Sequence, residues 1–327
     1  MISFLFVDSN YIIVDAVYTQ KGAFMKNRFT KSLALLSAMI SITACSSPQV
    51  RPLPGIESNV SELETLNTQN GVLGYEDSQS GKVTVLCVPG LGDTRGTFRM
   101  LAPLLVKSGY RVIVLDPRGQ GDSDATFDGY TARKAGEDIV EFIDKLKITP
   151  IIVGNSSGAA SAAWAASERP KQVRGLVFIG GFLRDHPMGF FQKLGLRLAL
   201  IGPWGPSIWI QYYKSLFITQ PPSDQETYTD ALSRSLKQKH HMSALRQLAF
   251  ASKSDVESRL REIKTPVLAL AGSKDPDFSN PKEELEWIHS QLGGEIGVIE
   301  GAGHYPQLEY PKDVFLRIES FISKNRS

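Results

Sequence analysis

The sequence has little cysteine, almost no net charge and no biased tract. Its only cysteines, Cys45 and Cys87, are too few for a disulfide framework, and Cys87 lies in an apolar run typical of a buried strand. Thirty-six basic residues face 34 acidic ones, and this formal net charge of +2 gives no sign of a nucleic-acid partner. There is no low-complexity segment and no solenoid or propeller repeat. The chain is 42% hydrophobic over 327 residues, enough for one large core and an inserted subdomain.

Histidine is also scarce, with five in the chain. His186, His240, His241 and His289 fall in one central segment or on expected helices. No pair of them has convincing zinc-ligand spacing, and no cysteine joins them. The sequence therefore predicts no metal site and no cofactor.

A targeting signal lies close to the N-terminus. From Met25 the chain reads "MKNRFTKSLALLSAMISITACSSP", with a basic start, an apolar stretch over 32–43 and a small-residue cleavage point at Ala44 and Cys45. This pattern predicts a secretory signal peptide over 25–44, too short to span a bilayer comfortably. Residues 1–24 fit no targeting pattern, so we expect Met25 to be the true start and 1–24 to be a misassigned extension.

The end of this segment, "ITAC", resembles the bacterial lipobox, whose cysteine is lipidated and becomes the first mature residue. With Ser46 rather than aspartate next, the resemblance implies lipidation of Cys45 and sorting to the outer membrane of a Gram-negative cell, facing the periplasm. The alternatives are an ordinary cleaved signal, giving a soluble periplasmic or secreted protein, or an uncleaved anchor. Residues 45–62, rich in Ser and Pro, are expected to form a tether.

Beyond the tether, apolar runs alternate with helical patterns. Strands are expected at 82–88, 111–116, 150–155, 173–181, 265–272 and 294–301, and helices at 97–109, 131–146, 158–168, 281–292 and 311–322. A hairpin over 64–81 is expected to enter the sheet. This alternation predicts the α/β class: a mostly parallel central sheet, built from 63–182 and 263–327 and covered by helices on both faces. Active residues then belong at the carboxyl ends of the strands.

Two adjacent serines lie at such a strand end, in "PIIVGNSSGAA" (150–160). A nucleophile in a strand-to-helix turn needs glycines two residues before and two after, where neighbouring backbones pass closely. Gly154 and Gly158 flank Ser156 in this way, whereas Ser157 would have Asn155 and Ala159. Ser156 is thus the candidate nucleophile. The backbone N–H of Ser157, at the helix N-terminus, can donate to a developing oxyanion.

An acid and a base follow in order at later strand ends. Asp275 follows the strand at 265–272, and His304 follows the strand at 294–301. With these motifs the chain resembles the α/β-hydrolase family, from about Leu63 to the C-terminus apart from the stretch after the sixth strand. The resemblance implies that Ser156 is the nucleophile, His304 the general base and Asp275 the acid that orients His304.

The segment "SKDPDF" offers a second carboxylate. Asp275 matches the family's acid and lies three residues after Gly272. Asp277 is expected either to cap the helix that begins near Pro281 or to face solvent.

The family's second oxyanion donor falls in "VPGLGDT" (88–94). The resemblance assigns it to the backbone N–H of Leu91, with Gly92 as the alternative. Pro89 replaces the histidine that the family usually has there. The signature "DPRGQGDSD" (116–124) also follows a strand, and we expect its Asp116 and Arg118 to brace the loop.

The alternation breaks between 183 and 262, where family members carry a helical cap. The cap sequence from 188 to 217 is dense in large apolar residues, too many for all to be buried. Some of them are expected to line an apolar substrate pocket. The candidates are Met188, Phe190, Phe191, Trp204 and Trp209.

These observations predict a serine hydrolase that cleaves a carboxylic ester with an apolar acyl or ring portion through an acyl-enzyme. The same triad serves thioesterases, amidases, peptidases, cofactor-free haloperoxidases and carbon–carbon hydrolases, so these activities remain alternatives. A small-ligand-binding protein with little or no catalysis is the rival from another class. The partners expected are a small apolar ester and a membrane, reached through the N-terminal lipid anchor.

Overall fold

The computed structural model describes residues 53–325. The predicted signal peptide, the lipidation of Cys45 and the extension at 1–24 lie outside these residues. Among the described residues, no helix combines the length and apolar composition that a bilayer crossing needs.

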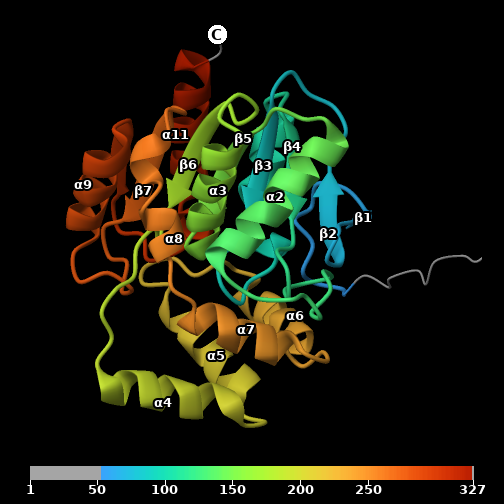
Figure 1. Cartoon of the computed structure of the whole chain (residues 1–327), viewed down its shortest axis with the longest axis vertical. Coiled ribbons are helices and arrows are strands. Elements are labelled where there is room, and N and C mark those ends of the chain that lie inside the picture. Colours follow the sequence, from blue (N-terminus) through green and yellow to red (C-terminus); the bar gives the residue numbers. More distant parts are fainter. Residues whose placement is uncertain (1–52, 326–327) are drawn as a thin grey trace, which may run out of the picture. The chain divides into compact units, whose positions relative to one another are not determined.

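An eight-stranded sheet forms the centre of the structure (Figure 1). Its strands are β1 (Leu63–Asn67), β2 (Val72–Asp77), β3 (Thr84–Val88), β4 (Arg111–Leu115), β5 (Ile151–Asn155), β6 (Gly175–Ile179), β7 (Val267–Gly272) and β8 (Glu295–Ile299). Their spatial order is β1-β2-β4-β3-β5-β6-β7-β8. The pairs β1–β2 and β2–β4 are antiparallel and all later pairs are parallel, so the predicted mostly parallel sheet and its entering hairpin are confirmed.

Helices cover both faces of the sheet, as expected for buried parallel strands. In chain order the helical elements outside the insertion are η1 (Arg95–Phe98), α1 (Ala102–Lys107), α2 (Ala132–Leu146), α3 (Ser157–Glu168), α8 (Ser254–Glu257), η2 (Leu260–Glu262), α9 (Pro281–Leu292), α10 (Pro306–Glu309) and α11 (Pro311–Lys324). Residues of α2, α3 and α9 pack in the core on one face, and residues of α1 and α11 pack in the core on the other.

Strand β3 shows why this sequence is a strand buried on both sides. Leu86 and Val88 belong to the core on one face, and Val85 and Cys87 to the core on the other. Successive side chains of a strand point to opposite faces, so an unbroken apolar run fills both cores. Cys87 is fully buried, and burial raises the pKa of its thiol.

The first four helices between β6 and β7 form the insertion: α4 (Phe190–Ile201), α5 (Gly205–Ser215), α6 (Gln225–Leu236) and α7 (His241–Phe250). They lie beyond the carboxyl ends of the strands, with α4 outermost (Figure 1). They build a core of their own, which includes Trp209, Tyr213 and Tyr228 and to which Tyr305 also belongs. After them, α8 packs against α2 and α3.

A buried ion cluster fixes the loops beneath the insertion. The fully buried Arg95 donates from Nε to Glu76 (2.7 Å) and from Nη1 to Asp116 and Asp122. Arg118 pairs with Asp138 at 2.6 Å. Asp116 and Arg118 therefore brace the loop, as predicted.

Candidate active site

Ser156 occupies the turn between β5 and α3. Its backbone has φ 52° and ψ −123°, a left-handed conformation that L-residues rarely adopt. Two backbone bonds hold it there: its N–H donates to the Ile179 carbonyl (2.9 Å), and its own carbonyl accepts from Phe182 N (3.1 Å). Non-glycine residues in such conformations cluster at active sites, where the surrounding structure offsets a strain of about 1–3 kcal/mol.

Gly154 and Gly158 are required by close backbone approach on both sides of Ser156. A Cβ at Gly154 would lie 2.6 Å from the Gly158 carbonyl oxygen. A Cβ at Gly158 would lie 2.4 Å from the Val88 carbonyl oxygen. Both distances are too short for a real side chain, which gives the sequence argument for Ser156 over Ser157 its physical basis.

His304 and Asp275 form a buried pair beyond the ends of β8 and β7. His304 Nδ1 donates to Asp275 Oδ2 at 2.8 Å, and both side chains are almost fully excluded from solvent. The other oxygen, Asp275 Oδ1, accepts from the backbone N–H of Asp277 at 3.0 Å. The carboxylate is thus held from two sides and fixes the orientation of the imidazole.

The pair lies next to the loop that holds Ser156. A Cβ at Gly180 would lie 3.2 Å from His304 Nδ1 and 3.3 Å from Asp275 Oδ2. Gly180 directly follows Ile179, which accepts the Ser156 N–H. The residues predicted as nucleophile, base and acid therefore surround one short segment, 179–182.

Asp277 takes neither of the positions expected from the sequence. Helix α9 is capped instead by Asn280, whose side chain accepts from the N–H groups of Lys282 and Glu283. Asp277 Oδ2 lies 3.7 Å from His304 Nε2, and Tyr212 of α5 donates to both of its carboxylate oxygens, at 2.7 and 2.8 Å. Desolvation and this carboxylate raise the pKa of Tyr212, so the phenol stays protonated and donates.

Two carboxylates therefore face the same imidazole, one at each ring nitrogen. Burial alone disfavours the imidazolium. The negative charges of Asp275 and Asp277, with the hydrogen bond to Asp275, outweigh burial and raise the pKa of His304 to about 9.

The loop after β3 lies directly against the nucleophile. A Cβ at Gly90 would lie 2.7 Å from Ser156 Cβ. The next two residues, Leu91 and Gly92, are the two candidates for the predicted second oxyanion donor. The Gly92 N–H donates to the Gln120 side chain. Because that N–H is already used, the geometry favours Leu91, together with Ser157 at the first position of α3.

The inserted helices hold the loop that carries His304. The His304 N–H donates to the Leu216 carbonyl at 3.0 Å. Glu309 accepts from Gly303 N (2.5 Å) with one oxygen and from the N–H groups of 218–220 with the other. The position of the imidazole thus depends on the segment between α5 and α6 as well as on the sheet.

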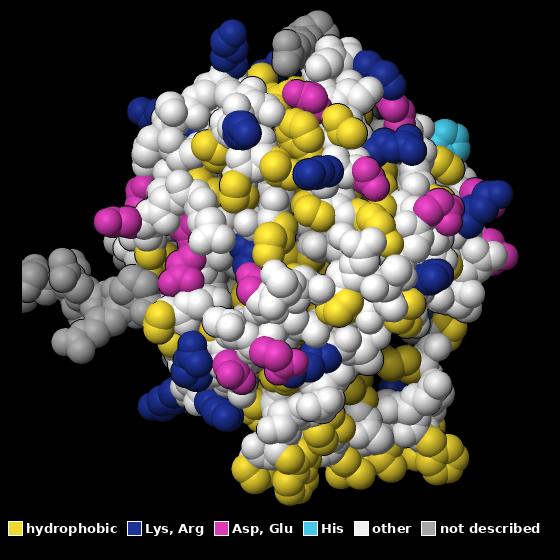
Figure 2. Space-filling model, turned by 180° about the vertical axis from the view of Figure 1, so that it is seen from behind, with side chains coloured by type: hydrophobic (Ala, Val, Ile, Leu, Met, Phe, Trp, Pro, Cys, Tyr) yellow, Lys and Arg dark blue, Asp and Glu magenta, His cyan; other side chains and the backbone are white. Residues whose placement is uncertain are grey.

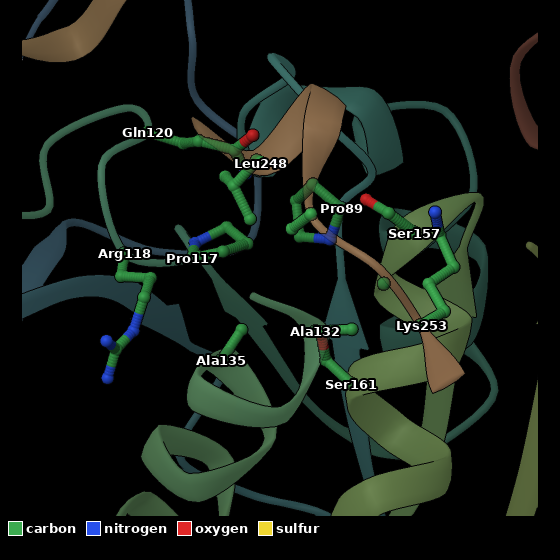
Figure 3. Close-up of a pocket in the computed structure, with 12 residues that line it drawn as sticks. Pro89, Pro117, Arg118, Gln120, Ala132, Ala135, Ser157, Ser161, Leu248 and Lys253 are labelled. Carbon is green, nitrogen blue, oxygen red and sulfur yellow. The ribbon is translucent and has the colours of Figure 1, made fainter. Parts of the chain in front are cut away.

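A small pocket lies on the Ser157 side of the turn (Figure 3). Its volume is about 30 Å³, room for about two water molecules. It is mostly apolar, and Leu248, Ala251 and Lys253 bring the end of the insertion to it. In Figure 3 the Arg118 guanidinium points away from the pocket, and it is paired with Asp138. Lys253 Nζ lies 3.9 Å from Asp185, and desolvation lowers its pKa.

None of the five residues predicted to line an apolar pocket lines either the pocket beside Ser157 or the smaller one between Gly92 and Leu245. Met188, Phe190, Phe191 and Trp204 are exposed instead, Phe191 to 82%. For Phe190 and Phe191 the reason is that Leu200 is the residue of α4 that is buried, so the start of the helix faces outward. Trp209 is buried, and it holds the loop after β3: Nε1 donates to the Gly92 carbonyl at 3.0 Å.

One group of the described residues could hold a metal ion. Donor atoms of Asp275, Asp277 and His304 lie within 4.8 Å of one another. Each carboxylate already has a protein partner, Asp275 in His304 and Asp277 in Tyr212. This arrangement suits proton transfer at the imidazole.

Several residues that shape the site were not identified from the sequence. Gln120 lies in the "DPRGQGDSD" signature, which could have flagged it. Tyr212 and Glu309 act across the boundary between the insertion and the core, and no local pattern marks such contacts. For Gly90 the sequence does offer a signal, because a glycine beside a predicted oxyanion donor indicates close backbone approach.

The chain is similar to known proteins over most of its length. A family model described as alpha/beta hydrolase fold matches residues 83–311. The 2-hydroxy-6-oxononadienedioate/2-hydroxy-6-oxononatrienedioate hydrolase of Paraburkholderia xenovorans is 27% identical over 288 residues, covering 81% of this chain and 99% of the relative.

Solved structures share the fold. A thermophilic esterase from Thermogutta terrifontis superposes with a TM-score of 0.69 at 22% identity, covering 82% of this chain and all of the esterase. A bromoperoxidase from Bacillus anthracis gives a TM-score of 0.66 at 19% identity, covering 80% and 99%.

Proposed function

The chain belongs to the α/β-hydrolase family, and from that membership we propose that it is a serine hydrolase acting through an acyl-enzyme on Ser156. The observation that carries the proposal is the buried pair of His304 and Asp275, 2.8 Å apart, beside the strained turn of Ser156. Nothing in a structural role requires this combination, because strain and buried charge both cost stability.

In the proposed reaction His304 Nε2 takes the proton of Ser156 Oγ, and Oγ attacks the substrate carbonyl. Asp275 holds the tautomer with the proton on Nδ1 and stabilises the imidazolium. The N–H groups of Leu91 and Ser157 stabilise the oxyanion. His304 then gives its proton to the leaving group, and a water activated by the same imidazole releases the acid.

The bond proposed for cleavage is a carboxylic ester with an apolar acyl or ring portion. The lining of the pocket beside Ser157, in which apolar groups predominate, supports this class. Its small volume implies that the end of α7 and residues 251–253 move when substrate binds.

Hydrolysis of a carbon–carbon bond in a carboxylate-bearing substrate is the second candidate. The observation in its favour is Lys253, a cation that lines the pocket. Its Nζ lies 3.9 Å from the carboxylate of Asp185. The Paraburkholderia relative is named for such a substrate, a dioate.

An activated short-chain ester tests the proposal. Mixing it with the purified chain should give a rapid burst of chromophore stoichiometric with protein, followed by slower turnover, because acylation of Ser156 precedes deacylation. A binding protein of this fold would give no burst. Comparing a panel of esters with a 2-hydroxy-6-oxo dienoate, by kcat/KM, distinguishes the two candidate substrate classes.

We also propose that the mature chain is anchored to the outer membrane through Cys45. Cys45→Ala should move the protein from the membrane fraction to the periplasm and stop incorporation of labelled palmitate, since a lipobox without its cysteine has no acceptor for the lipid. Fractionation of cells expressing each form is the measurement. An unaltered protein found wholly in the soluble periplasm would overturn this proposal.

A further inference from the structure

Helix α4 carries an unusual amount of exposed apolar surface. Phe190 is 74% exposed, Phe191 82% and Ile201 65%, and Leu194, Leu198 and Trp204 are exposed as well. We call these six side chains the α4 surface. Figure 2 shows hydrophobic side chains gathered over the inserted helices, at the lower end of the view. Exposed patches of this kind mark an interaction site in a folded protein.

The helix is apolar on two opposite sides. Leu196 and Leu200, four residues apart, belong to the core of the insertion. Phe191, Leu194, Leu198 and Ile201 are spaced by three and four residues and so form a second stripe that faces away. A helix that is apolar all round is normally buried on all sides. Here the chain covers the stripe of Leu196 and Leu200 and leaves the second stripe exposed.

The segment that carries this surface has charge of one sign only. From His186 to Ser223 the sequence contains no Asp or Glu, although the whole chain has 34. Lys193 and Arg197 lie on α4 itself. Lys214 on α5 is already paired with Glu226, at 2.6 Å. A second copy of the chain would bring these cations together without an acidic partner from the same segment, so the charge disfavours a symmetric pair.

We propose that the α4 surface docks onto an anionic lipid bilayer. The exposed apolar stripe enters the interfacial region, Arg197 at the edge of the stripe meets the phosphate groups, and Trp204 lies at the headgroup level that tryptophan prefers. Lys193, on the Leu200 side of the helix, adds to the positive potential that attracts an anionic surface. The twelve residues of α4 extend about 18 Å, short of the roughly 30 Å hydrocarbon core. The helix therefore lies in the plane of the surface. This contact is separate from any lipid on Cys45.

Vesicle sedimentation tests the proposal in the full chain carrying Cys45→Ala, so that no acyl anchor contributes. We expect binding to vesicles of phosphatidylcholine and phosphatidylglycerol in equal amounts, and weaker binding to phosphatidylcholine alone. The double variant Phe190→Ser/Phe191→Ser should lower the partition coefficient at least about tenfold, because two large apolar side chains no longer enter the bilayer. Lys193→Gln/Arg197→Gln should reduce binding to the anionic vesicles selectively.

The matched control removes two exposed apolar side chains elsewhere. Ile296 on β8 and Leu316 on α11 are 39% and 58% exposed, and Ile296→Ser/Leu316→Ser should bind vesicles like the parent. Circular dichroism and the unfolding midpoint establish that each variant is folded. Unchanged binding by the phenylalanine variant would overturn the proposal. So would a concentration-dependent dimer of the parent, formed without lipid, that the same variant abolishes.

Discussion

Ser156→Ala should lower turnover of an activated ester about a million-fold, whereas Ser157→Ala should retain substantial activity. The first value is the loss seen when the nucleophile of a serine triad is removed, which leaves only binding and the oxyanion donors. Labelling by a fluorophosphonate should vanish in the Ser156 variant and persist in the Ser157 variant.

The backbone explains why two adjacent serines should differ so strongly. Ser156 has φ 52° and is held by Ile179 and Phe182, whereas Ser157 already begins helix α3. What Ser157 contributes to the proposed oxyanion hole is its N–H, which alanine keeps. Alanine at 156 keeps the Cβ that Gly90 approaches, so the turn should be retained.

The two variants are controls for each other, because each removes one hydroxyl from the same turn. Both should unfold at temperatures close to that of the parent. An inactive Ser157 variant beside an active Ser156 variant would show that the nucleophile has been assigned to the wrong serine.

The sheet and the turn could be predicted because their signals are local. Unbroken apolar runs predict strands buried on both faces, and β3 fills two cores as its sequence requires. The glycines around Ser156 mark close backbone approach, which the structure shows at Gly154 and Gly158. The positions of Asp275 and His304 follow from the rule that active residues lie at strand ends.

The insertion could not be predicted in the same way. An apolar residue on a helix indicates that something covers it, but the sequence does not say whether the cover is the chain itself. The sequence therefore suggests Phe190 and Phe191 as pocket residues, whereas α4 turns them outward. For the same reason the sequence gives no sign of Tyr212, whose hydrogen bond to Asp277 joins residues 65 positions apart.

Asp275→Asn should lower turnover on the order of ten-thousandfold with the fold intact. An asparagine can present its NH₂ to His304 Nδ1 and so favour the tautomer with the proton on Nε2, which cannot accept from Ser156. The 2.8 Å contact between Asp275 Oδ2 and His304 Nδ1 makes this residue the orienting acid. The measurement is kcat for an activated ester, with circular dichroism as the check on folding.

Asp277→Asn is the matched change at the other ring nitrogen, and its effect should be on pH dependence. The negative charges of Asp275 and Asp277 raise the pKa of His304 to about 9 despite burial. The imidazole must be neutral to act as a base, so kcat/KM should rise with pH up to that region. Asparagine removes one of the charges and lowers the pKa of His304, which moves the rise to lower pH. At neutral pH this variant should therefore be faster than the parent, by up to about tenfold, since one pKa unit changes the neutral fraction tenfold.

Tyr212→Phe separates charge from position. It removes the phenol that holds Asp277 but leaves the carboxylate, so the pH profile should stay close to that of the parent or shift toward higher pH. If Asp277→Asn collapsed turnover at every pH while Asp275→Asn did not, Asp277 would be the orienting acid. In that case the imidazole would have to rotate so that Nδ1 faces Asp277, whose Oδ2 lies 3.7 Å from Nε2 in this structure.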